Sequence, residues 1–263
     1  MKPTQMLSRI VLSAAAALLV LPSANADETA TLKMTFKYKG DAPAPKFLDP
    51  NKDKAFCGLH KIPDESLVVN QENNGIKNVI VYLKAGRRDR KNLPDTKPEP
   101  KTHILANENC RFEPHVIIAH AGDTIKVTNP DTVGHNANFA FFANNQQNLT
   151  VPSGGAVEVK VDEAEPAAIP VACNIHEWML SHLIVLDHPF AAVSDENGVL
   201  EIKGIPAGVE FEFRASHDTG SFDDISVGGK AEKWENNRFK MELKPGMNDL
   251  GVVELDAADF QSK

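Results

Sequence analysis

Short runs of alternating polar and apolar residues, separated by turn signals, are the dominant pattern of this 263-residue chain. Segments 31–38 (TLKMTFKY) and 157–161 (VEVKV) alternate with a period of two, as half-buried strands do. Turn-forming residues recur at short intervals, as at 121–123 (AGD) and 195–198 (DENG). Beyond residue 26 no stretch sustains the 3.6-residue period of an amphipathic helix. The pattern predicts an all-β protein built from sandwiches of short strands.

The composition is that of a globular protein with a buried core. Hydrophobic residues make up 42% of the chain and charged residues 24%, which excludes a disordered tail, a collagen-like repeat and a disulfide-dense miniprotein. The formal net charge is −8. An acidic chain is a poor match for nucleic acid or an anionic membrane, so we expect neither as the main partner.

The first 26 residues are predicted to be a signal peptide. Lys2 and Arg9 supply a positive start, and residues 10–21 form an apolar run that is short for a bilayer span. Residues 24–26 (ANA) have the small-x-small pattern of a cleavage site; an uncleaved anchor is the alternative. We therefore expect a mature chain that begins at Asp27, has no membrane span and works in the periplasm or outside the cell.

The segment 173–179 (CNIHEWM) carries the most specific chemistry. It places a thiolate, an imidazole and a thioether at the spacing C-x2-H-x2-M, and His135 lies upstream in a Gly-His-Asn turn. Two His nitrogens, one Cys sulfur and one weak Met sulfur form the ligand set of a blue-copper centre. The soft sulfur and borderline nitrogen donors suit both oxidation states of copper. A zinc site is an alternative, although zinc rarely uses Met, and so is a chain without metal.

The stretch from about Thr102 to Pro189 resembles a cupredoxin, the Greek-key β-sandwich of blue copper proteins such as amicyanin, pseudoazurin and plastocyanin. The motifs that carry the resemblance are Phe112-x-Pro114, Ala121-Gly-Asp123, Val127-x-Asn129, His135-Asn136 and the C-x2-H-x2-M loop. The resemblance implies one type 1 copper ion with three equatorial ligands and one axial ligand: His135, Cys173 and His176, and then Met179. It also implies that Asn136 ties the His135 loop to the Cys173 loop.

The resemblance also implies where electrons pass. In cupredoxins the second His of the loop is the edge of the copper nearest solvent, so His176 is expected to face a redox partner: a cytochrome, an oxidase or a dehydrogenase. Core packing of the apolar neighbours of His176 is the alternative. Glu177 departs from the family, which often has Pro there, and Trp178 is expected to pack against the site and exclude water.

The three cysteines are an odd number, so at least one thiol has no partner within the chain. Cys57 and Cys110 have polar or turn-forming neighbours, and our hypothesis is that they form a disulfide that leaves Cys173 for copper. The alternative is that both are buried free thiols.

A second sandwich is predicted from segment 193–208. This segment resembles the carboxypeptidase regulatory-like, transthyretin-like sandwich through an Asp-x-x-Gly turn, an alternating strand and Ile-Pro-x-Gly. Such a sandwich, which is immunoglobulin-like in architecture, normally opens with strands like those at 31–38 and 76–83, so it is expected to be split around the copper domain. The alternative is one long cupredoxin from 27 to 189 with a separate tail domain. The predicted domains are a signal peptide (1–26), N-terminal strands and a linker (27–95), the cupredoxin-like domain (96–189) and the C-terminal part of the second sandwich (190–263).

These observations predict that the chain is a periplasmic type 1 copper protein that carries single electrons and catalyses no reaction. No phosphate-binding loop, nucleophile elbow or second copper motif is found in the sequence. Two alternatives remain: a periplasmic copper carrier or copper-resistance protein that uses the same ligands, and an interaction module with a vestigial site.

Overall fold

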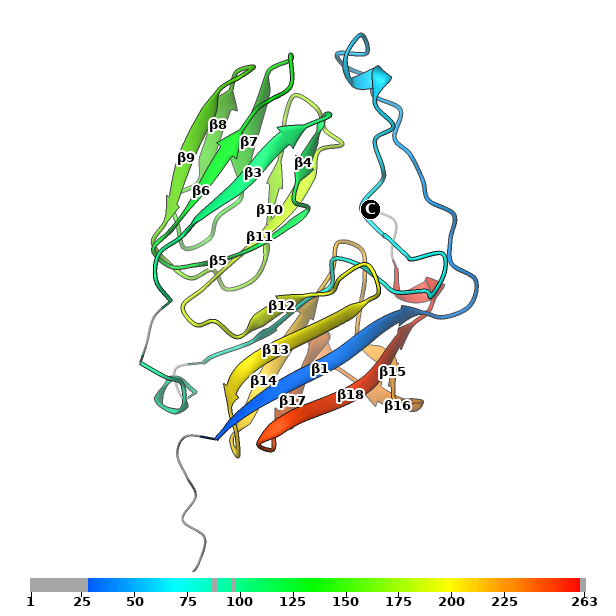
Figure 1. The fold of residues 1–263 in the computed structure, drawn as a ribbon, viewed down its shortest axis with the longest axis vertical. Helices are drawn as coiled ribbons and strands as arrows, with labels where there is room; N and C mark the ends of the chain where they lie inside the picture. Colours follow the sequence, from blue (N-terminus) through cyan, green and yellow to red (C-terminus); the bar gives the residue numbers. More distant parts are fainter. Residues whose placement is uncertain (1–27, 87–88, 96–97, 261–263) are drawn as a thin grey trace, which may run out of the picture.

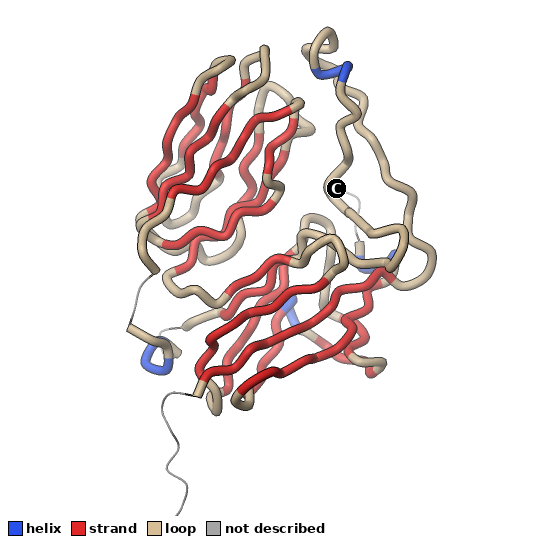
Figure 2. The backbone as a smooth tube through the Cα atoms, viewed as in Figure 1, coloured by secondary structure: helices blue, strands red, loops and turns tan. Residues whose placement is uncertain are grey.

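The computed structural model describes residues 28–86, 89–95 and 98–260, and it consists of two β-sandwiches (Figures 1 and 2). The prediction of an all-β fold with two sandwiches is confirmed. The predicted signal peptide lies outside the described residues. Within them no helix is long and apolar enough to cross a membrane. The helical segments are short 3-10 turns: η1 (Cys57–Leu59), η2 (Arg90–Asn92), η3 (Glu235–Asn237) and η4 (Ala257–Asp259).

The insert sandwich is built from consecutive strands between residues 102 and 186. Its first sheet has the order β4 (Arg111–Glu113), β3 (Thr102–Glu108), β6 (Asp123–Thr128) and β9 (Ala156–Val161). Its second sheet has the order β5 (Val116–His120), β11 (Leu180–Leu186), β10 (Ile169–Ala172), β7 (His135–Phe139) and β8 (Gln147–Val151). Alternate side chains of both sheets, such as Ile125 and Phe139, fill one core.

The split sandwich combines strands from both ends of the chain. One sheet has the order β13 (Val199–Pro206), β1 (Thr29–Tyr38), β18 (Gly246–Leu255), β15 (Asp224–Val227) and β16 (Lys230–Lys233). The other has the order β12 (Ala191–Val193), β2 (Ile80–Leu83), β14 (Glu210–Ser216) and β17 (Arg238–Glu242). In Figure 1 the blue strand β1 lies between the yellow β13, which it meets antiparallel, and the red β18, which it meets parallel. The domain boundaries themselves stay a prediction.

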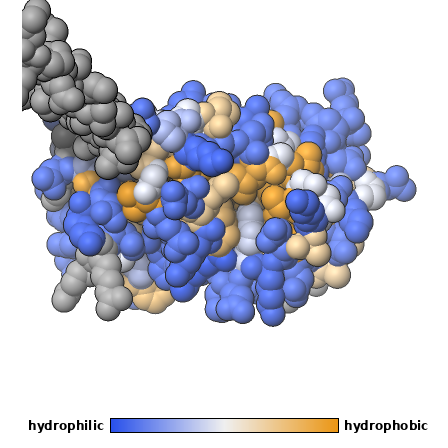
Figure 3. Space-filling view, turned by 90° about the horizontal axis from the view of Figure 1, so that it is seen from below, coloured by the Kyte–Doolittle hydropathy of each residue, from blue (hydrophilic) through white to orange (hydrophobic). Residues whose placement is uncertain are grey.

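The alternation in β1 places one face of the strand in the core of the split sandwich. Leu32, Met34 and Phe36 are fully buried there, while the intervening residues lie on the outer face. On the neighbouring β18, Met247 remains 59% exposed. Viewed from below, the molecule shows a band of apolar side chains across a mostly hydrophilic face (Figure 3).

Strand β2 joins the two sandwiches. All four of its residues are buried: Val81 and Leu83 face the core of the split sandwich, whereas Ile80 and Tyr82 pack against Ile184 of β11 and its neighbours. A strand buried on both faces loses the polar–apolar alternation, which explains the continuous apolar run in this segment. The insert sandwich is therefore packed directly on the split sandwich.

Residues 46–64, which we call the Asp53 loop, form an excursion between β1 and β2. Its two ends are held together by backbone hydrogen bonds from Leu48 to Ile62 (2.9 Å) and from Asp64 to Lys46 (3.0 Å). The Cys57–Cys110 disulfide fixes it to the β3–β4 turn of the insert sandwich. The predicted disulfide is thus confirmed, and Cys173 is the free, buried cysteine of the described residues.

Removing this disulfide is expected to destabilise the folded protein strongly. The bridged residues are 53 positions apart. In the loop-entropy treatment, closing a loop of that size stabilises the fold by about 4 kcal/mol. Replacing Cys57 and Cys110 with Ala should therefore lower the denaturation midpoint, measured by chemical unfolding of the metal-free protein. An unchanged midpoint would show that the disulfide does not stabilise the fold by anchoring the Asp53 loop.

Candidate metal centre

His135 opens strand β7 and is held by a buried carboxylate. Its Nε2 lies 2.9 Å from Oδ2 of Asp131, and neither residue is more than 4% exposed. Because a carboxylate only accepts hydrogen bonds, Nε2 carries the proton and Nδ1 keeps its lone pair. Burial lowers the pKa of His135, and the nearby His176 lowers it further, whereas the hydrogen bond with Asp131 raises it. The neutral ring is the form that can bind a metal.

The Asp131 carboxylate also caps the turn between β3 and β4. Asn109 and Cys110 both have positive φ, 55° and 56°, and their N–H groups donate to Asp131 at 2.7 and 2.8 Å. The two hydrogen bonds favour a left-handed turn that a Cys residue rarely adopts. Through this turn Asp131 links the His135 ring to the disulfide.

The loop that follows strand β10 carries the remaining predicted ligands. Cys173 donates its N–H to the carbonyl of Met179 (3.1 Å), and Met179 donates its own to the carbonyl of His176 (2.9 Å). The His176 N–H points at the Cys173 Sγ at 3.4 Å. The backbone of the loop thus fixes the relative positions of the sulfur and the imidazole.

Three of the predicted ligands meet in the interior. Nδ1 of His135 lies 2.9 Å from Nδ1 of His176, which lies 3.8 Å from Sγ of Cys173. All three side chains are buried, and their donor atoms form a group of the size that holds one ion. At 2.9 Å the two nitrogens share either a proton or a metal ion, because two bare lone pairs at that distance would repel each other. The donor set and its convergence fit a copper ion, or another ion that accepts nitrogen and thiolate donors.

The contacts described above do not fix the position of the Met179 sulfur relative to the other three ligands. Its side chain is 1% exposed and packs in the same hydrophobic cluster as Cys173. Its backbone belongs to the ligand loop, whereas the assignment of its sulfur as the axial ligand stays a prediction.

Asn136 connects the two ligand-bearing segments. Its Oδ1 accepts from the backbone N–H of Asn174 (2.9 Å) and Ile175 (3.3 Å), and lies 3.4 Å from Cys173 Sγ. Its Nδ2 donates to Oδ1 of Asn148 at 2.7 Å and to Oδ1 of Asn174 at 3.1 Å. The amide therefore fixes the Cys173 loop against strand β7.

The expectation that His176 faces solvent is wrong. The ring is fully buried, and its Nε2 lies 2.8 Å from Oδ2 of Asp53. The disulfide draws the Asp53 loop over the ligand loop, so a carboxylate covers the ring edge that the cupredoxin resemblance had assigned to a partner. Asp53 itself remains 45% exposed.

Sequence reasoning missed both carboxylates. Asp131 lies two positions after the Val127-x-Asn129 motif but has no motif of its own. Asp53 is separated from His176 by 123 positions. The proximity of Asp53 to Cys57 was the one available signal, because a Cys57–Cys110 bridge would bring this loop toward the copper domain.

Trp178 seals the site on the side of the disulfide. Its ring centroid lies 5.1 Å from that of His176, and its Nε1 donates to the carbonyl of Cys110 at 2.9 Å. It also packs on the apolar cluster around Cys57 and Ile62. The predicted contact between Trp178 and the site is present.

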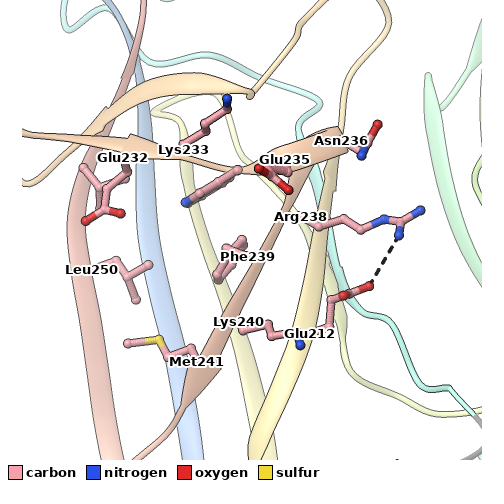
Figure 4. A pocket seen from close by; sticks show the side chains of 12 residues that line it. Glu212, Glu232, Lys233, Glu235, Asn236, Arg238, Phe239, Lys240, Met241 and Leu250 are labelled. Atoms are coloured by element: carbon pink, nitrogen blue, oxygen red, sulfur yellow. Dashed lines mark ion pairs between the residues drawn. The ribbon is translucent and has the colours of Figure 1, made fainter.

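A cavity of about 620 Å³ in the split sandwich offers no comparable chemistry. It lies beside β14 and β17 and is lined mainly by charged and apolar side chains, with an Arg238–Glu212 ion pair at 3.8 Å (Figure 4). No His or Cys is among its lining residues. Within the described residues, the convergent nitrogen and thiolate donors lie instead in the insert sandwich.

Comparisons with known proteins give similarity to copper proteins over about a third of the chain. No family model matches the sequence, and no curated protein matches it. A copper-containing nitrite reductase from Thermus scotoductus is 18% identical over 34% of this chain and 23% of that chain, with a TM-score of 0.29. A Cu(I) amicyanin variant is 17% identical over 34% of this chain and 96% of that chain, with a TM-score of 0.28.

Replacing Asn136 with Ala is expected to destabilise the metal-free protein by about 1–3 kcal/mol, because several loop groups lose a buried partner. Asn148→Ala is the matched control, since it removes only one of the hydrogen bonds that Asn136 makes. Urea unfolding of both variants measures the difference. Equal midpoints for the two variants would show that Asn136 does not hold the loop.

Proposed function

We propose that this chain is a type 1 copper protein of the periplasm that carries single electrons and catalyses no reaction at its copper. His135, Cys173 and His176 would be the equatorial ligands and Met179 the axial ligand. The observation that carries the proposal is the convergence of two Nδ1 atoms and one Sγ in a buried site. Copper, when bound there, supplies the one-electron couple between its +1 and +2 states.

The chain's own residues keep this donor set in place. Both imidazoles have a carboxylate on Nε2, Asp131 in one case and Asp53 in the other, so each ring presents Nδ1 inward. The Cys173 sulfur accepts from a backbone N–H. A donor set held by its own hydrogen bonds moves little between oxidation states, which favours rapid electron transfer.

Burial of the ligands favours electron transfer over copper delivery. A carrier must let a receiving protein reach its donor atoms, whereas His135, Cys173 and His176 are each at most 1% exposed. An electron needs no such access, because it can cross the half-exposed Asp53 carboxylate that covers the His176 edge. We therefore place the contact of a redox protein partner on the Asp53 loop.

The proposed location rests on two features. The predicted signal peptide directs export, and the Cys57–Cys110 disulfide is typical of an oxidising compartment.

Copper loading tests the proposal. The metal-free protein is expected to become intensely blue with one equivalent of Cu(II), through thiolate-to-copper charge transfer from Cys173, and to lose the colour reversibly on reduction. Cys173→Ser should abolish the blue band, whereas the control Met179→Leu should retain it. A colourless protein that binds only Cu(I) would support the carrier function, and no copper uptake would contradict both.

Removing the Asp53 carboxylate is expected to raise the rate of electron exchange with ferricyanide several-fold, because the His176 edge becomes uncovered. Stopped-flow oxidation of the Cu(I) protein measures the rate. Asp49→Ala is the matched control: it removes the same charge from an exposed position of the same loop. Equal rates for Asp53→Ala and Asp49→Ala would show that only charge, and not the cover, matters.

A further inference from the structure

A second group of metal-binding side chains lies where the two sandwiches meet. His115 and His182 come from the insert sandwich and Asp218 from the loop between β14 and β15, and their donor atoms lie within 4.8 Å of one another. Asp218 Oδ2 is 3.1 Å from His115 Nε2, and Asp218 Oδ1 is 2.7 Å from His182 Nδ1. Donors bound tetrahedrally to one ion at about 2.1 Å are about 3.4 Å apart. The two Asp218 distances are shorter, as in ion pairs, so a shared ion requires the three groups to separate slightly.

We propose that His115, His182 and Asp218 bind a divalent first-row transition-metal ion. Two imidazoles and one carboxylate are the donor set used by mononuclear zinc, copper and non-haem iron sites that keep open positions. The proposal is independent of the copper site, because it uses none of its ligands.

The backbone holds the two imidazoles in position. The His182 N–H donates to the carbonyl of His115 at 2.8 Å, and the hydroxyl of Ser181 donates to the same carbonyl at 3.0 Å. The ring centroids are 5.6 Å apart. The two rings are therefore placed side by side by β-structure and need no ion to bring them together.

Asp218 differs from a carboxylate with a purely structural role. The comparable Asp123 lies 2.7 Å from His103, but it also accepts backbone N–H groups from Lys101 and His120. The contacts found for the Asp218 carboxylate are with the two imidazoles, and its Oδ1 approaches His182 without hydrogen-bond geometry. These contacts of Asp218 therefore come from the two rings that would share the ion, and not from the backbone.

The surroundings also suit a bound ion. The Nδ1 of His115 is buried without a hydrogen-bond partner, and the Glu65 carboxylate lies 3.9 Å away, where it could take up that N–H once Nε2 binds a metal. A cavity of about 120 Å³ borders His115, Asp218 and Met179, which is room for a few waters in the open positions. Asp218 also borders a cavity of about 500 Å³, which gives an ion a route of entry.

Cobalt(II) titration of the full mature chain tests the site, because the two sites give different spectra. A Co²⁺ at the Cys173 site produces strong thiolate charge transfer, whereas one at His115, His182 and Asp218 produces only weak visible bands. Two Co²⁺ ions per chain are expected for the unchanged protein. Asp218→Asn should bind one, with the thiolate band intact, and the matched control His103→Asn should bind two.

A single Co²⁺ that gives the thiolate band in the unchanged protein, or two Co²⁺ in Asp218→Asn, would overturn the proposal. A single Co²⁺ without the thiolate band would instead count against the copper site. A measurement that needs no variant is the imidazole NMR spectrum of the unchanged protein. Added Zn²⁺ should shift His115 and His182 and leave His103 unaffected, and the absence of these shifts would also overturn the proposal.

Discussion

The arrangement of the metal centre depends on the buried Asp131 carboxylate. It binds the His135 ring and both N–H groups of the turn that carries Cys110. Cys110 is bridged to Cys57, whose loop places Asp53 on His176. The contacts close a ring around the convergent donor atoms. Removing a hydrogen bond from a buried charged group costs folding free energy. Each residue of this ring therefore restricts the positions of the others.

The Asp53 loop changes how much of the metal site is exposed to solvent. A cupredoxin resemblance places the second imidazole at the surface, whereas here the Asp53 carboxylate covers it and is itself half-exposed. In addition, Asp218 of the split sandwich lies against the two imidazoles of the insert sandwich, His115 and His182. Residues outside the insert sandwich thus contact it at two histidine groups. The split sandwich is consequently part of the chemistry that we propose, and not only a spacer.

The sequence was sufficient for the parts that depend on local spacing. Alternation at 31–38 reports one buried face of β1, and the loop spacing places Cys173 and His176 on one tight turn, as the structure shows. The sequence could not predict contacts between segments that are far apart in the chain. Asp53 and His176 are 123 positions apart, and Asp218 and His115 are 103 apart. No periodicity links such pairs, so only their packing brings them together.

By itself the sequence determined the all-β class, the ligand loop and the odd cysteine, because strands and short loops are governed by the preferences of neighbouring residues. The tertiary structure decided which groups surround those ligands. It buried His176 under Asp53, joined Asp131 to the disulfide turn and brought Asp218 to a second pair of histidines. The Asp53 contact exists because the disulfide ties the Asp53 loop to the insert sandwich. The Asp218 contact exists because β14, which precedes Asp218, pairs with β2, and β2 packs against the insert sandwich.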